Sequence, residues 1–98
     1  MPAYLILFSF TAQGIHKIKE SPARVQAAKR TVEAMGGQTK AFYALLGSQY
    51  DTLFVIEAPD DETAARMSMA ISTGGNVRSE THRLFTEGEF GKLIASLS

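Results

Sequence analysis

A carboxylate stands beside a phenol in the pair Tyr50-Asp51, at the start of an apolar segment. An aspartate there could act as a general base, with the phenol as a hydrogen-bond donor. Aspartate is also common in turns, where it accepts hydrogen bonds from backbone N–H groups. The pair is therefore a candidate either for proton transfer and ligand contact, or for a hairpin cap in which Tyr50 packs at the turn's edge.

A second candidate is a row of charged side chains within residues 76–85. Arg78, Glu80 and His82 are spaced two apart, so in an extended strand they share one face. A histidine beside a carboxylate is suited to proton transfer near neutral pH. The row could instead be a solvated or salt-bridged strand face, or line a cavity or a seam between two subunits.

Several kinds of site lack the residues they need. The chain has no cysteine, which removes disulfides, thiolate metal sites and cysteine nucleophiles. Neither His16 nor His82 has a partner at metal-ligand spacing, and there is no phosphate-binding glycine motif, so we expect no metal and no cofactor. Ten basic residues balance ten acidic ones, and this balance argues against a nucleic-acid partner.

The elements that must position these residues follow from the hydrophobic pattern. Strands are predicted from apolar runs, and helices from apolar residues spaced three and four apart between capping residues and glycine pairs. Ser21 is expected to cap the first helix, with Pro22 at its first position, and Asp60 to cap the second. Thr86 and Glu89 have the spacing of a capping box. The pattern leaves residues 11–20 unassigned. The predicted strands are 3–10, 39–46, 50–58 and 76–85, and the predicted helices begin at 21, 60 and 86.

The order β-α-β-β-α-β with a terminal helix predicts an α+β fold of the ferredoxin-like kind. All of residues 1–98 would form one domain with a four-stranded antiparallel sheet and both main helices on one face. The strands are apolar on both faces, although an antiparallel sheet with one solvated face should alternate. We therefore predict a homodimer joined by sheet faces, a dimeric α/β barrel. Alternatively, residues 11–20 and the last helix would cover the second face in a monomer.

Blocks along the chain resemble the GYD domain family. The first comprises the opening strand, Gly14-Ile15, Ser21-Pro22-Arg24 and Gly36-Gly37, and the others surround Tyr50-Asp51 and Gly75-Asn76. Two residues separate Gly47 from Tyr50, where the family pattern has one. The resemblance implies a dimeric α/β-barrel fold, a group that includes cofactor-free monooxygenases and lactone isomerases, and implies no single reaction.

We expect a cytoplasmic homodimer that binds a small, partly apolar organic molecule between sheet and helices. Zero cysteines fit a reducing compartment, and the apolar run 4–10 is too short to span a membrane. The alternatives are a cofactor-independent oxygenase or isomerase with Asp51 or His82 handling protons, and an interaction module without a pocket. The candidate ligand-binding residues are Tyr4, Phe8, Tyr43, Tyr50, Arg78 and His82.

Overall fold

Four antiparallel strands form one sheet in the order β2-β3-β1-β4. The computed structural model describes all 98 residues. The strand order places the first and third strands side by side at the centre, as the split βαβ arrangement requires. The predicted α+β class and the antiparallel sheet are confirmed. In chain order the elements are β1 (Ala3–Phe10), α1 (Ala12–His16), the 3-10 helix η1 (Ile18–Glu20), α2 (Ser21–Ala34), β2 (Gln38–Ala44), β3 (Thr52–Glu57), α3 (Asp61–Ser72), β4 (Val77–Leu84) and α4 (Glu87–Ala95).

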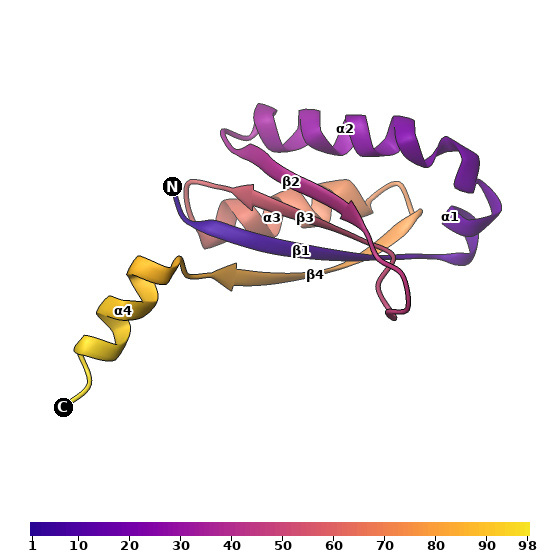
Figure 1. Ribbon diagram of the computed structural model, residues 1–98. Coiled ribbons are helices and arrows are strands. Elements are labelled where there is room, and N and C mark those ends of the chain that lie inside the picture. Colours follow the sequence, from indigo (N-terminus) through magenta and orange to yellow (C-terminus); the bar gives the residue numbers. More distant parts are fainter.

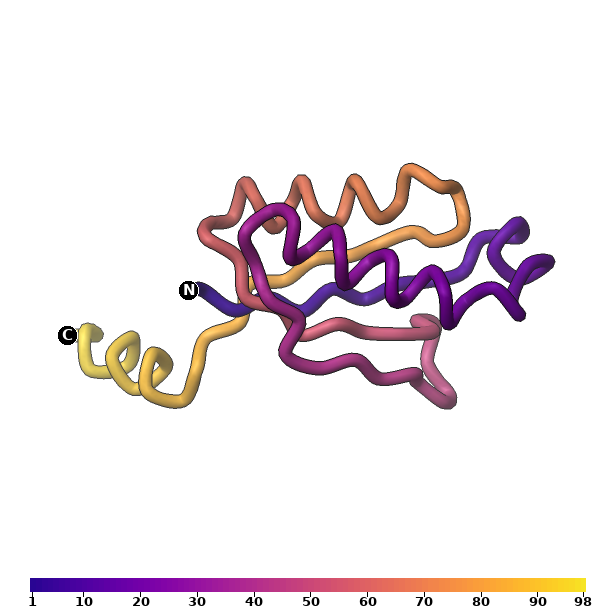
Figure 2. The backbone as a smooth tube through the Cα atoms, turned by 90° about the horizontal axis from the view of Figure 1, so that it is seen from above, coloured from indigo at the N-terminus to yellow at the C-terminus, as the bar shows by residue number.

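The core lies between the sheet and the two long helices. Figure 1 shows α2 and α3 on the same side of the sheet, and Figure 2 shows them next to each other above the strands. Alternate residues of β1 and β3 point into this layer, where Phe8 meets Phe54 edge to face with ring centroids 5.5 Å apart. From the helices, Val32 and Met67 are fully buried against them. Burial of side chains this large dominates the stability of the fold.

The helix ends follow the predicted capping, with one exception. The Asp60 carboxylate accepts a hydrogen bond from the Thr63 backbone N–H at 2.8 Å, and Thr86 with Glu89 forms the expected capping box. Ser21 does not cap α2, because the helix begins at Ser21 itself, directly after η1. Its hydroxyl accepts a hydrogen bond from Arg24 instead.

The opposite face of the sheet is not covered by any helix. Leu7 lies across from Leu53 on one neighbouring strand and from Glu80 on the other, so all three share this open face. Leu5 and Val55 pair beside them, and all four apolar residues are only half-buried. Neither α1 nor α4 covers the face in a single chain: α1 lies at the far end of β1, and α4 projects away beyond β4 (Figure 1).

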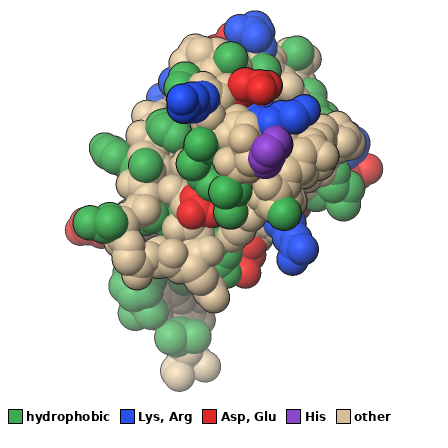
Figure 3. Space-filling model, turned by 90° about the vertical axis from the view of Figure 1, so that its right-hand side faces the viewer, with side chains coloured by type: hydrophobic (Ala, Val, Ile, Leu, Met, Phe, Trp, Pro, Cys, Tyr) green, Lys and Arg blue, Asp and Glu red, His purple; other side chains and the backbone are tan.

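The surface at one end of the molecule mixes charged and apolar groups (Figure 3). On the end of the molecule that carries α1, cationic, anionic and apolar side chains are interspersed (Figure 3). No helix has the length and hydrophobicity needed to cross a membrane.

Candidate functional site

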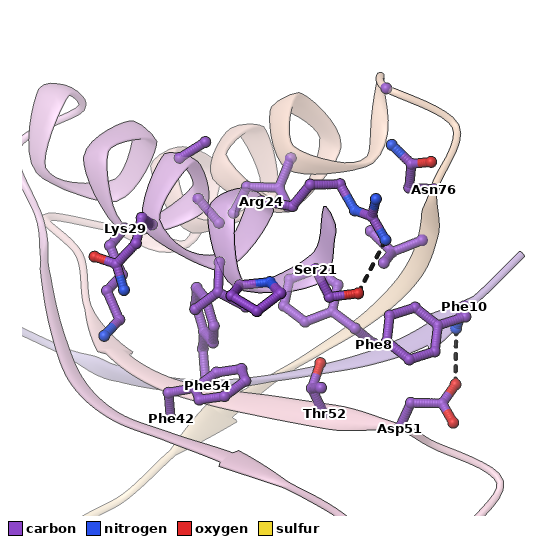
Figure 4. Close-up of a pocket in the computed structure, with 18 of the residues that line it drawn as sticks. Phe8, Phe10, Ser21, Arg24, Lys29, Phe42, Asp51, Thr52, Phe54 and Asn76 are labelled. Atoms are coloured by element: carbon purple, nitrogen blue, oxygen red, sulfur yellow. Dashed lines mark hydrogen bonds between the residues drawn. The ribbon is translucent and has the colours of Figure 1, made fainter. Parts of the chain in front are cut away.

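A cleft of about 640 Å³ lies between α2 and the sheet. The C-terminal half of α2 packs tightly through Ala28 and Val32, whereas Val25 nearer its start is only half-buried. The N-terminal half of the helix therefore leaves space above the strands (Figure 4). The sheet supplies the floor, in which Phe42 packs edge to face on Phe54 at 5.3 Å. The residues that line the cleft include Phe8, Phe10, Val25, Phe42, Asp51, Thr52, Phe54 and Asn76.

Asp51 sits at one end of this cleft and is bound to the backbone. Its Oδ2 accepts a hydrogen bond from the Phe10 N–H at 2.8 Å, and its own N–H donates to the Phe8 carbonyl at 2.8 Å. Its carbonyl accepts from the Leu45 N–H at 2.9 Å. Asp51 thus fastens the β2–β3 turn to β1, and its carboxylate accepts from a backbone N–H of β1 rather than from one of the turn itself.

Arg24 occupies the rim of the cleft and is also engaged. Its guanidinium donates to the carbonyls of Lys17 at 3.1 Å and Gly14 at 3.4 Å, and to the Ser21 hydroxyl at 3.0 Å. These bonds hold the α1–η1 segment against α2. The segment contributes Ile18 to the lining of the cleft.

A separate cluster lies on the open face of the sheet. Tyr50 donates its hydroxyl hydrogen to Glu80 Oε1 at 2.7 Å, and His82 Nε2 lies 2.6 Å from Glu80 Oε2. These bonds lower the pKa of Glu80, the His82 contact most and the Tyr50 contact next. The bond to the Glu80 carboxylate chiefly raises the pKa of Tyr50. Glu80 and His82 lie two residues apart on the same face of β4, and the β2–β3 turn brings Tyr50 to them. These three residues form a Tyr-Glu-His group.

Tyr4 lies on the helix-covered face but at the other end of β1 from Phe8. It borders a smaller hollow of about 270 Å³ between α3 and β4, with Ser68 and Arg83. Its hydroxyl donates to Asp61. Burial, followed by the Asp61 hydrogen bond, raises the pKa of Tyr4 to about 12.

The structure therefore divides the predicted site residues among several places. Phe8 and Asp51 line the cleft, Tyr50 and His82 meet on the open face, and Tyr4 stands apart. Tyr43, across from Leu53 on β2, is 64% exposed on the open face, and Arg78 is exposed on β4. The cleft residues Phe10, Phe42 and Phe54 were not predicted as site residues from the sequence. Phe10 shares a strand face with Phe8, and this alternation was the signal that could have identified it.

The model of the GYD domain family matches residues 4–94, nearly the whole chain. The chain belongs to the GYD domain family. A curated relative of this GYD domain is a Thermus thermophilus protein named "Glutamine synthetase and cystathionine beta-lyase binding protein". It is 32% identical over 82 residues, covering 83% of this chain and 85% of the relative.

Solved structures share the fold of this GYD domain. The leucine response regulatory protein LrpA of Mycobacterium tuberculosis superposes with a TM-score of 0.64 at 13% identity, and MtbAldR with 0.67 at 18%. These matches cover 87% and 88% of this chain but only 51% and 54% of those chains, so the GYD domain spans about half their length. A protein of Thermus thermophilus matches with a TM-score of 0.56 at 22% identity, over 88% of this chain and 95% of its own.

The longer turn of this GYD domain, Gly47 to Tyr50, is ordered by local bonds. Gly47 adopts a positive φ of 78°, which glycine takes without strain. The Tyr50 N–H donates to the Ser48 hydroxyl at 3.1 Å, and the Ser9 hydroxyl donates to the Gln49 carbonyl at 3.2 Å. The turn sends Tyr50 to the open face and Asp51 to β1, so the two neighbours serve different sites.

Proposed function

We propose that this GYD domain is a non-catalytic binding protein of the cytoplasm, and that its cleft takes a small, partly apolar organic molecule. The cleft beneath α2 carries the proposal. Its volume of about 640 Å³ lies within the range of roughly 300–1,000 Å³ typical of small-molecule sites. The cysteine-free composition supports a reducing compartment.

The lining supports a ligand with an apolar body and one polar end. Phe42 and Phe54 give the floor flat aromatic surfaces, while Asp51, Thr52 and Asn76 bring polar atoms to the lining (Figure 4). Aromatic walls with a few polar groups orient small ring compounds. We therefore propose a small aromatic or lactone-like molecule with a hydrogen-bond donor.

Proton transfer fits the geometry less well. Asp51 already accepts a backbone hydrogen bond, and His82 lies on the opposite face of the sheet from the cleft. The two residues therefore do not flank one substrate position, as a shared acid–base site would require.

A ligand-observed NMR screen of small aromatic acids and lactones tests the cleft. Val25→Phe would fill the space under α2, and Leu46→Phe serves as a control because Leu46 is fully exposed in the turn. We expect compounds to bind the wild type and Leu46→Phe, and Val25→Phe to bind at least about tenfold more weakly. Binding that Val25→Phe leaves unchanged would place the ligand elsewhere.

We further propose that the domain works as a homodimer joined by the open sheet faces. Leu5, Leu7, Leu53 and Val55 form an apolar centre on this face, of the kind that marks an interaction surface. A second copy related by a twofold axis would cover it with the same surface. Sedimentation should give twice the chain mass of 10.6 kDa, and Leu53→Glu should return it to one chain mass. The single-chain mass for the wild type at micromolar concentration would contradict the dimer.

A protein-binding role is the second candidate, favoured by the name of the Thermus thermophilus relative. Purified glutamine synthetase and cystathionine β-lyase are the probes, each passed over the immobilised domain. Saturable binding of either enzyme would support this role. A response no greater than that to serum albumin would count against it.

A further inference from the structure

Helix α4 carries an apolar stripe that packs on nothing in the single chain. Phe90, Leu93 and Ile94 recur at spacings of three and four, and each is about half exposed. No residue of the helix is buried. Figures 1 and 2 show it extending past the end of β4, away from the sheet and from the other helices.

The helix is nevertheless built and held in place. The capping box fixes its first turn, and Glu89 lies 3.4 Å from the guanidinium of Arg83 on β4. The same guanidinium stacks on the Phe85 ring at 4.7 Å from the centroid. A nine-residue helix is marginal by itself in water, so a packing partner for its apolar stripe would stabilise it further.

The area of the open sheet face also indicates a missing contact. Four strands about 4.8 Å apart and about 23 Å long give roughly 450 Å² per protomer, or about 900 Å² for a sheet-to-sheet pair. Stable interfaces bury about 1,200–2,000 Å² in total. Each α4 is about 13 Å long and 10 Å wide, so docking both helices adds about 500 Å², and the pair then reaches about 1,400 Å².

We propose that α4 is an exchanged arm: in the homodimer, each protomer packs the stripe of Phe90, Leu93 and Ile94 on the second copy, beside the sheet-to-sheet contact. This inference rests on the homodimer proposed above. The twofold axis makes the exchange reciprocal, so one apolar stripe per chain completes two equal contacts. Because β4 runs directly into α4, the arm is continuous with the open face that forms the rest of the interface.

Paired variants on the two sides of α4 test the arm. Leu93→Glu places a carboxylate in the stripe, and Gly88→Glu places the same group on the opposite side, where only the Thr86 hydroxyl comes near, at 3.9 Å. We expect Leu93→Glu to raise the dimer dissociation constant at least about tenfold, since each dimer loses two buried leucines. Gly88→Glu should not weaken the dimer, because a glutamate in the first turn favours the helical form of α4.

The outcomes separate the arm from the dimer. If the wild type is dimeric and Leu93→Glu has the same dimer dissociation constant, the proposed exchange of α4 is wrong, whereas the sheet-to-sheet dimer is still supported. If the wild type runs at the mass of one chain, both fail. Circular dichroism of dilute Leu93→Glu should show an intact fold, because Leu93 contributes nothing to the core of the single chain.

A spin label shows directly where the arm lies. Because the chain has no cysteine, Ser96→Cys provides a single attachment point at the end of α4. Spin-labelled protein is mixed with ¹⁵N-labelled protein without a spin label, so any broadening arises between copies. Broadened amides clustered on one surface of the second copy would support the arm. A dimeric sample without such a cluster would overturn it.

Discussion

The hydrogen-bond partner of the Asp51 carboxylate indicates a structural role for this residue. Its Oδ2 accepts from the Phe10 N–H, so we expect Asp51→Ala to lower the free energy of unfolding by about 1–2 kcal/mol. Asp51→Asn retains a carbonyl acceptor and should lose less. Urea unfolding of the three proteins measures this difference. If Asp51→Ala unfolds at the wild-type urea concentration, the bond to β1 contributes nothing.

Tyr4 should make the protein sensitive to alkali. Its pKa is about 12 when folded and 10.0 ordinarily, so the unfolded chain releases this proton first. The contribution of protonated Tyr4 to the free energy of unfolding is fully present below about pH 10 and is lost as pH rises toward 12. We expect the urea midpoint of the wild type to fall over this interval more than that of Tyr4→Phe. Equal falls would show that other groups cause the alkaline loss.

The residues of the candidate site could be predicted only in part. The turn residues 47–49 correctly placed the Tyr50-Asp51 pair beside the β2–β3 hairpin, and period-two spacing correctly placed Glu80 and His82 on one face of β4. It did not show which face the helices cover, because that depends on how α2 and α3 pack. Phe8 therefore lines the cleft whereas Tyr43 and His82 lie on the other face, although all three were expected around one pocket.

At the level of elements, strong periodicity predicted the four strands and three helices. The segment α1–η1 lacked any such pattern, since five residues are too few for a helical stripe. It is ordered by distant partners instead: the Thr11 hydroxyl donates to the Gly75 carbonyl at 2.6 Å, and the Gln13 amide to the Gly74 carbonyl at 2.9 Å. Contacts between residues some sixty positions apart cannot be derived from local spacing.

The contact between α1 and the α3–β4 loop should be intolerant of substitution. A Cβ at Gly14 would lie 2.0 Å from the Asn76 carbonyl oxygen, a backbone atom that can yield little. We expect Gly14→Ala to lower the free energy of unfolding by more than about 2 kcal/mol, measured in urea. Gly91→Ala is the control for an added methyl group, because nothing lies near a Cβ there, and it should not lower the free energy of unfolding. Equal midpoints for Gly14→Ala and wild type would mean that α1 is not packed as described.

Gly91 also allows the helicity of α4 to be increased without touching its stripe. Alanine is a better helix former than glycine by about 0.8–1.0 kcal/mol. If α4 docks as a helix on a second copy, Gly91→Ala should tighten the dimer by about twofold or more, as measured by sedimentation over a dilution series. An unchanged or weaker dimer would argue that α4 does not form part of the interface.

For the whole molecule, the two proposed binding surfaces lie on opposite faces of the sheet. The cleft is on the face covered by α2 and α3, and the dimer contact is on the open face. Filling the cleft with a ligand need not displace the second copy. A ligand found by the screen should accordingly bind the dimer without dissociating it into single chains.

Coupling of folding to association should be visible in the melting temperature. When a second copy binds only the folded chain, stability rises with protein concentration by mass action. The wild type should therefore melt several degrees higher at about 200 µM than at about 2 µM, whereas Leu53→Glu, confined to one chain, should melt at the same temperature at both concentrations. The core residues Phe54 and Ile56 beside Leu53 face the helices and remain packed in that variant. A wild-type melting temperature independent of concentration over this range would mean that the open face folds without a partner.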